Sequence, residues 1–279
     1  MTQTSYSRAV STARDYYNSD DADRFYLHVW GGEDIHIGLY ESDEEPIFDA
    51  SRRTVAHMPD LLGELAPRQR VLDLGAGYGG AARYLAGTFG CSVVALNLSE
   101  VENARNRENN RAQQLDHLID VVDGSFEEVP FEDGYFDVVW SQDAFLHSGD
   151  RAQVIREAAR VLKPGGIFIF TDPMQTDDCP EGVLQPILDR IHLETLGSPD
   201  FYREQCAQAG LLEIGFEDHT PQLARHYGRV LRETKRLQPE LEEIISRDYI
   251  ERMKRGLQHW VDGGRSGYLC WGIFRFRKA

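Results

Sequence analysis

The segment 71–80 limits the possible folds of this chain more than any other. A short apolar run, RVLDL (70–74), leads directly into a turn with glycines at positions 75, 77 and 79, and a helical pattern follows. Glycine tolerates positive φ and lets a ligand approach the backbone closely. Such a turn is typical of the nucleotide-binding edge of a parallel sheet, although a tight strand–helix turn without a ligand would need the same glycines.

The same alternation of apolar runs and helical patterns continues along the chain. We predict further strands at 91–97, 118–122, 135–141, 167–172, 211–220 and 266–278, and helices at 79–90, 151–162, 198–210 and, with a break near Pro239, over 221–264. Nearly continuous apolar strands indicate a sheet covered on both faces. The predicted fold is therefore α/β, with a doubly wound, mostly parallel seven-stranded sheet. We divide it into an N-terminal lid and substrate segment (1–60), a core (61–220), a helical insertion (221–265) and a last core strand (266–279).

Composition excludes several classes of protein. The formal net charge is −16, which disfavours nucleic acid as a partner because phosphate would be repelled. No segment approaches the length of a membrane span, the N-terminus lacks the apolar region of a signal peptide, and the four cysteines show no metal spacing. We therefore predict a cytoplasmic protein without a metal ion. Only four of the 30 basic residues are lysine, which is typical of salt-adapted surfaces and also of GC-rich genomes.

Two motifs together are more specific than the glycines alone. Asp73 precedes the glycine turn by two residues, and VLKPGG (161–166) precedes the predicted fifth strand. In this combination the chain resembles class I S-adenosylmethionine-dependent methyltransferases over about residues 65–175. The resemblance implies a Rossmann-like methyltransferase fold and S-adenosyl-L-methionine as cofactor. It implies cofactor-binding roles for Asp73, Gly75, Ala76, Gly77, Asn97, Leu98, Asp123, Gly124, Ser125, Phe126 and Gln142.

Within that implied site, two positions keep alternatives open. Asn97 stands where many of these enzymes have a ribose-binding acid, and its amide can still bond hydroxyl groups. Asp123 matches the position of an adenine-binding group, but a plain loop acid would look the same. Asp143 and His147 follow the predicted fourth strand, where the family faces the methyl group. We take both as catalytic candidates, against the simpler roles of a loop acid and a packing histidine.

The N-terminal segment is rich in aromatic residues and contains GGEDIHIGLY (31–40). With NLSEVENARN (97–106) and WGIFRFRK (271–278), it resembles the sarcosine/dimethylglycine N-methyltransferases of glycine betaine synthesis. A methylated amine suits aromatic faces, and a substrate carboxylate suits arginine. We predict Tyr26, Trp30, His36 and Tyr40 as substrate-binding residues, although aromatic packing alone is an alternative. Arg52 and Arg53 are offered for the carboxylate.

The resemblance implies methyl transfer to the amine of sarcosine and dimethylglycine, which yields glycine betaine as an osmoprotective solute and fits a halophile. The alternatives are phosphoethanolamine, a carbon or oxygen site of an apolar metabolite, or a cofactor-binding protein without catalysis. A wide apolar pocket between residues 1–60 and 221–264 would favour the apolar acceptor. The sequence leaves the oligomeric state open between monomer and dimer.

Overall fold

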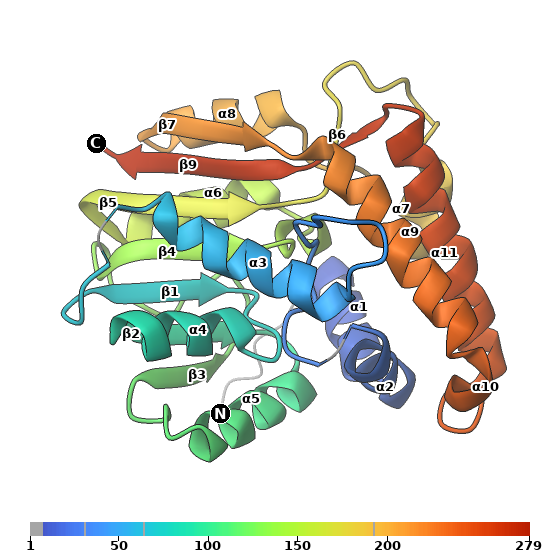
Figure 1. The fold of residues 1–279 in the computed structure, drawn as a ribbon. Coiled ribbons are helices and arrows are strands. Elements are labelled where there is room, and N and C mark those ends of the chain that lie inside the picture. Colours follow the sequence, from blue (N-terminus) through green and yellow to red (C-terminus); the bar gives the residue numbers. More distant parts are fainter. Residues whose placement is uncertain (1–7, 31, 64, 192) are drawn as a thin grey trace.

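Seven strands form one sheet in the order β3-β2-β1-β4-β5-β9-β7 (Figure 1). The structure is a computed structural model, and it describes residues 8–30, 32–63, 65–191 and 193–279. The strands are β1 (Arg70–Leu74), β2 (Ser92–Asn97), β3 (Ile119–Asp123), β4 (Phe136–Gln142), β5 (Leu162–Thr171), β7 (Leu211–Asp218) and β9 (Gly272–Lys278). Strand β9 is antiparallel to both of its neighbours, β5 and β7, and the other strand pairs are parallel. The sheet is therefore mostly parallel, and the predicted fold class is confirmed.

The central strands are apolar because both faces of the sheet are covered. Leu72 of β1 lies opposite Val94 of β2 and Val139 of β4, and Leu72 and Val139 are fully buried. One face packs against α6 (Arg151–Val161) and α8 (Pro199–Gln208). The other packs against α3 (Ile47–Asp60) and α4 (Gly80–Phe89), while α5 (Glu100–Ala112) lies beside β2 and β3.

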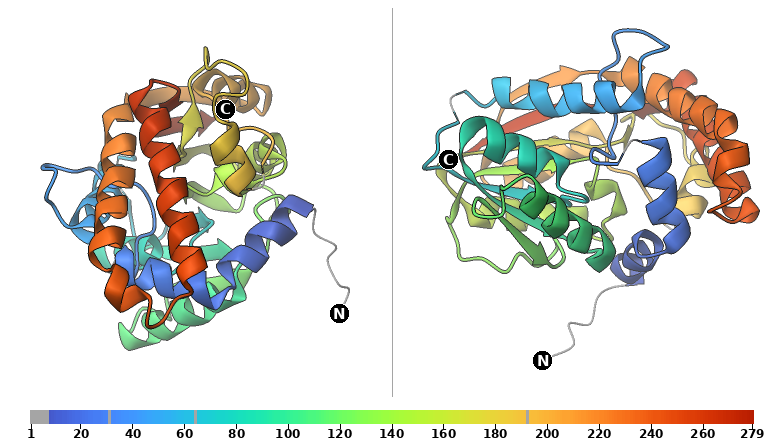
Figure 2. Two further views of the ribbon diagram at one scale, coloured as in Figure 1. Left: turned by 90° about the vertical axis from the view of Figure 1, so that its right-hand side faces the viewer. Right: turned by 60° about the horizontal axis from the view of Figure 1, so that its bottom comes forward.

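A helical cap covers the carboxyl ends of the parallel strands (Figures 1 and 2). It consists of α1 (Arg8–Tyr17), α2 (Asp20–Val29), α7 (Gln185–Ile191), α9 (Thr220–Arg236), α10 (Gln238–Leu241) and α11 (Arg247–Arg265). The N-terminal helices and the predicted insertion meet there, since Phe25 and Trp30 pack in one apolar cluster with Val230 and Tyr249. The predicted insertion thus packs on the predicted lid.

Some predicted boundaries were wrong. The fifth strand begins at Leu162 and includes the Lys-Pro-Gly-Gly turn, because β5 pairs with Phe136 before a register shift. The last strand is interrupted at Trp271: β8 (Leu269–Cys270) leaves the main sheet to pair with β6 (Met174–Gln175), which was not predicted. Residues 1–7 and 31 of the predicted lid lie outside the described part of the chain.

The predicted lid segment contains one element that serves the core. Helix α3 packs on the sheet, where Val55 and Met58 are fully buried beside Val71. The division into four parts itself stays a prediction. Among the described residues, no helix combines the length and apolarity that a membrane crossing requires.

Candidate active site

Two cavities share a wall at the carboxyl edge of the sheet. The narrow cavity, of about 80 Å³, lies over the glycine turn between β1 and α4. The large cavity, of about 1090 Å³, lies between α1, α2, α7, α9 and α11. Five residues line both: Ala13, Tyr17, Ile35, Asp143 and His147. A ligand in the narrow cavity would therefore lie next to a ligand in the large one.

The glycine turn is held against β2 by its backbone. The amides of Gly75 and Ala76 both donate to the carbonyl of Leu96, at 2.9 and 3.2 Å. Gly75 and Gly77 have φ of +78° and +51°, and a Cβ at Gly75 would overlap the side chain of Ala144. Both glycines line the narrow cavity, whereas Ala76 is not among its lining residues. The turn needs glycine for its backbone conformation and for the space beside it.

Asp73 lies at the end of β1, directly before this turn. Its side chain is 3% exposed, and its Oδ2 has no hydrogen-bond partner within the described chain. Burial raises the pKa of Asp73 to about 7. An unpaired buried carboxylate is unfavourable unless a cation or donor meets it. Asp73 is not among the residues that line either cavity, so its role toward the ammonium group of S-adenosylmethionine stays a prediction.

Asn97 works together with an acid that the sequence analysis missed. Its Nδ2 donates to Oε2 of Glu102 at 2.9 Å, and both residues line the narrow cavity. Glu102 is 3% exposed, its Oε1 has no partner in the ranges described, and burial raises its pKa to about 7. Ser99 and Glu102 match the helix-capping pattern S-x-x-E, so in the sequence Glu102 cannot be distinguished from an ordinary capping residue. Glu102 restores the carboxylate that Asn97 lacks.

The other predicted cofactor residues divide into two groups. Leu98, Ser125, Phe126 and Gln142 line the narrow cavity, and Nε2 of Gln142 is buried without a partner in the described ranges. Asp123 and Gly124 are not among the lining residues. Asp123 instead accepts hydrogen bonds from Asn103 and Arg107, at 2.8 and 2.7 Å, and the amide of Gly124 donates to Asn97. Their roles stay predictions.

Helix α1 forms one wall of the narrow cavity. Asn18, directly after this helix, accepts from Ser99 Oγ at 2.8 Å and donates to Glu100 at 2.8 Å. Arg14 forms an ion pair with the same glutamate. These contacts place Ala13 and Tyr17 over the cavity, as a lid requires.

Asp143 lies in the wall between the cavities and accepts three hydrogen bonds from the protein. Its Oδ1 accepts from Trp271 Nε1 at 2.7 Å and from Thr171 Oγ1 at 2.8 Å, and its Oδ2 accepts from the amide of Ile37 at 2.6 Å. Burial raises the pKa of Asp143, although these donors and His36 counteract the rise. These three hydrogen bonds join the loop around Ile37 to β5 and to Trp271, and the catalytic role of Asp143 stays a prediction.

His147 also lies in the shared wall. Its Nε2 is 2.8 Å from the hydroxyl of Tyr17, and the two rings meet edge to face. Burial, together with Arg151 and Arg190, lowers the pKa of His147 to about 4. The imidazole is therefore neutral near pH 7 and too weak a base to hold a proton there. It serves better as a hydrogen-bond partner for Tyr17.

Three of the four predicted substrate residues line the large cavity: Tyr26, Trp30 and His36. The Tyr26 ring lies 5.1 Å from Trp30 and 5.9 Å from Tyr17. Tyr40 is buried outside the lining, where its hydroxyl lies 3.0 Å from His226 Nδ1. Further lining residues from α1, α9 and α11 were not predicted from the sequence: Tyr16, Tyr17, His226, Tyr227 and Tyr249.

The arginines offered for a carboxylate were the wrong ones. Arg52 pairs with Asp34 at 2.9 Å, and Arg53 pairs with Glu45, so neither cation is free for a substrate. Arg190 of α7 lines the large cavity and, in the described chain, has no carboxylate partner within 4 Å. Nothing in the sequence singles it out among 26 arginines.

Together, the glycine turn, the buried acids Asp73 and Glu102, each with one carboxylate oxygen lacking a partner among the described residues, and the adjoining cavity define a class I methyltransferase that uses S-adenosylmethionine. Comparison with known proteins agrees: residues 72–170 match a family described as a methyltransferase domain. The chain is 66% identical to the sarcosine/dimethylglycine N-methyltransferase of Halorhodospira halochloris, over 98% of each protein. It is 54% identical to the enzyme of the same name from Aphanothece halophytica, over 95% of this chain and 96% of the other.

A solved structure gives the same result. A crystal structure from Galdieria sulphuraria, assigned to the sarcosine dimethylglycine methyltransferases, superposes with a TM-score of 0.90 at 47% identity, covering 95% of this chain and 99% of the other. The chain belongs to the family of sarcosine/dimethylglycine N-methyltransferases, as its sequence motifs predict.

Proposed function

We propose that this enzyme methylates the amine of sarcosine and of dimethylglycine and so produces glycine betaine. The observation that carries the proposal is Arg190, a cation without a carboxylate partner in the described chain, beside a cavity rich in aromatic rings. Sarcosine and dimethylglycine combine a carboxylate with an amine. The names of the similar enzymes support the same substrates. We also propose the cytoplasm as the location, because a compatible solute acts there.

Arg190 is positioned to bind the substrate carboxylate. Its Nη2 contacts Met253 Sδ at 2.7 Å, and its side chain lies so close to α11 that a Cβ on Gly256 would overlap it. Both contacts leave the guanidinium without an opposite charge. A guanidinium can bond a carboxylate through two parallel N–H donors, which fixes the orientation of a small amino acid.

The aromatic rings suit the amine end of the substrate. Tyr17 lines both cavities, and the rings of Tyr26 and Trp30, which line the large cavity, follow it at 5.9 Å from Tyr17 to Tyr26 and 5.1 Å from Tyr26 to Trp30. Their faces attract the positive charge that develops on the amine nitrogen. S-adenosylmethionine, when bound, supplies a sulfonium methyl group. We assign its ammonium group to Asp73 and its ribose hydroxyls to Glu102 and Asn97.

Proton removal does not require a strong base in the wall. Asp143 already accepts three hydrogen bonds, and His147 is neutral with a lowered pKa. We propose that the amine loses its proton to solvent as it enters, and that the enzyme then contributes mainly orientation and proximity.

One observation favours a larger acceptor. The large cavity, of about 1090 Å³, lies between the N-terminal segment and α9–α11, where a wide pocket was the feature expected of an enzyme for apolar metabolites. Its lining carries charges of both signs, which suit a small zwitterionic amino acid better than an apolar metabolite: Arg190, Arg252, Arg255, Asp15, Asp20, Asp21, Asp143 and Asp189. A panel of acceptors with labelled S-adenosylmethionine distinguishes the two functions.

The test measures sarcosine, dimethylglycine, phosphoethanolamine and phenolic acceptors with the native enzyme, and then dimethylglycine with Arg190→Met. We expect turnover of the two amino acids and an increase of about 10- to 100-fold in KM for dimethylglycine in the variant, the value of a charge-assisted hydrogen bond. The KM for S-adenosylmethionine should stay unchanged. Arg236→Met, at an exposed arginine of α9, is the matched control.

Dimethylethanolamine, which lacks a carboxylate, separates recognition from general damage. Native enzyme and Arg190→Met should methylate it equally poorly. Equal losses with both acceptors would argue against carboxylate binding by Arg190. Turnover of phenolic acceptors without turnover of sarcosine or dimethylglycine would overturn the proposed function.

A further inference from the structure

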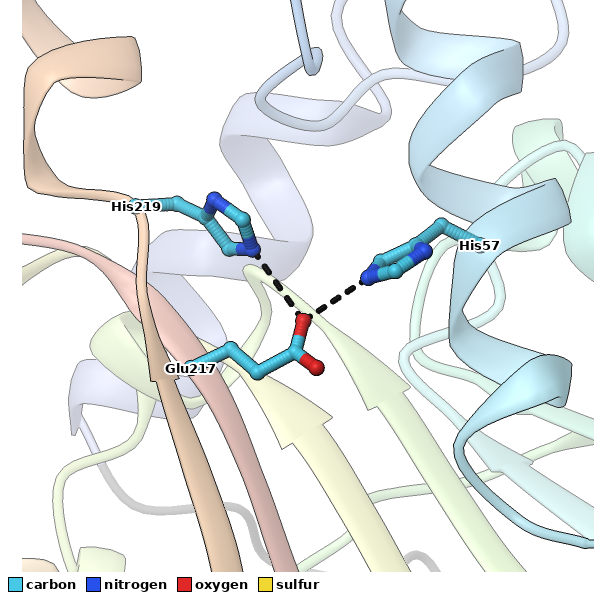
Figure 3. A group of neighbouring side chains, drawn as sticks. All are labelled: His57, Glu217 and His219. Carbon is cyan, nitrogen blue, oxygen red and sulfur yellow. Dashed lines mark hydrogen bonds and ion pairs between the residues drawn. The ribbon is translucent and has the colours of Figure 1, made fainter.

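Three possible metal ligands meet outside the active site (Figure 3). His57 comes from α3, Glu217 from the end of β7, and His219 lies directly before α9. Nε2 of His57 lies 2.7 Å from Oε2 of Glu217, and Nε2 of His219 lies 3.2 Å from the same oxygen. All three ligand atoms lie within 4.8 Å of one another. Among the described residues, no other group of this kind is found.

We propose that His57, Glu217 and His219 bind one transition-metal ion of the zinc or nickel type. Two imidazoles and one carboxylate are a donor set that zinc accepts, with water in the fourth position. Tetrahedral bonds of about 2.0–2.1 Å place ligand atoms about 3.4 Å apart. Small side-chain rotations reach that spacing from the observed 2.7 and 3.2 Å.

The cluster is accessible to an ion from solvent. The three side chains are between 28% and 33% exposed, so an ion can reach them from solvent while the surrounding residues still restrict their rotation. The two imidazoles approach Glu217 from opposite sides (Figure 3). Their ring centroids lie 6.1 Å apart, and the ring planes are nearly perpendicular. This convergence from three elements, with both Nε2 atoms directed at one oxygen, distinguishes the cluster from a simple surface ion pair.

A bound ion would connect two elements that hold the substrate cavity. On α3, the Thr54 hydroxyl donates to the carbonyl of Ile37 at 2.9 Å and accepts from the amide of Leu39 at 3.1 Å. These bonds fix the loop that contains Ile37 and Leu39. On α9, His226 lines the large cavity. The ion joins His57 to His219 and thereby stabilises the packing of these walls. It is a structural clamp with an open water position, separate from methyl transfer.

The test titrates zinc chloride into the tag-free, chelator-treated full chain by calorimetry, with cobalt absorption as a second probe. We expect one ion per chain with micromolar affinity or tighter. At 100 times the dissociation constant, the unfolding temperature should rise by about 4 °C. His57→Gln and His219→Gln should each weaken zinc binding at least tenfold. His117→Gln, at an exposed histidine outside the cluster, should bind as the native protein does.

Binding of S-adenosylhomocysteine shows that each variant is folded, independently of the metal. Absence of zinc binding by the native chain would overturn the proposal. So would equal zinc affinity in His57→Gln and His117→Gln. A thiolate-to-cobalt charge-transfer band would assign the ion to cysteine instead, and would equally overturn it.

Discussion

Replacing Asp143 with asparagine tests whether this residue fixes the lid or takes part in the chemistry. The carboxylate accepts three hydrogen bonds, from Ile37 N, Thr171 Oγ1 and Trp271 Nε1. An amide has one oxygen, so its NH₂ group must face either the Ile37 amide or the Trp271 indole, and both are donors. The backbone is unaffected, because asparagine also tolerates the φ of +51° found here.

The expected loss of stability follows from one buried donor without a partner. Such a donor costs about 1–3 kcal/mol, and removing a buried charge recovers part of that cost. We expect a net loss of about 2 kcal/mol, which lowers the unfolding temperature by about 3 °C in a chain of this size. If catalysis requires the loop around Ile37 to stay bonded to Asp143, a loss of about 2 kcal/mol from that contact lowers kcat/KM for dimethylglycine by up to about 30-fold, since each 1.4 kcal/mol is a factor of ten.

Calorimetry and steady-state kinetics on the same samples provide the measurement. Thr171→Val is the matched control, because it removes one donor and leaves the carboxylate with the other two. Its effects should be smaller than those of Asp143→Asn. A fall in kcat of more than about 1000-fold with an unchanged unfolding temperature would show a chemical role for Asp143, as a base or an amine ligand. That result would refute the positioning role argued from the hydrogen bonds.

Four further predictions concern the cofactor cavity and the surface. Gly77→Val should abolish S-adenosylhomocysteine binding in calorimetry, because a β-branched residue disfavours φ of +51° and fills the approach to the turn; unchanged affinity would contradict this. Glu102→Ala should weaken the same binding by about 10- to 100-fold and Glu102→Gln by less, whereas equal affinities would remove Glu102 from the site. Because burial raises the pKa of Asp73 to about 7, its carboxylate is neutral at lower pH, so affinity should fall from pH 8 to pH 6. Asp73→Asn should make this dependence shallower without abolishing it, because burial raises the pKa of Glu102 to about 7 as well; an identical slope in the variant would rule Asp73 out. The unfolding temperature should hold or rise between 0.1 and 2 M potassium chloride, because salt screens the repulsion within a net charge of −16, and a steep fall would exclude salt adaptation.

The chain order of the fold was predictable because each signal for it is local. The RVLDL run, the glycine turn and the apolar strand patterns each depend on a few neighbouring residues, and they predicted the seven strands and the cofactor edge. The glycines were predictable for the same reason, since only glycine suits the backbone of that turn. The sequence could not show that Leu269–Cys270 would leave the main sheet, because its partner, β6, is more than 90 residues away.

The composition of the active site depended on the tertiary structure. Glu102 resembles a helix-capping residue in the sequence and becomes a cavity acid only because α5 carries it beside Asn97. From the sequence, Asp143 is a catalytic candidate. The structure adds that its carboxylate accepts hydrogen bonds from Ile37 and Trp271, which are more than 230 residues apart in the chain. Arg190 is one of 26 arginines, and it differs from Arg52 because, among the described residues, no carboxylate lies within ion-pair distance of it. Sequence determines the local backbone, whereas the charge and reactivity of a side chain depend on neighbours that only folding brings together.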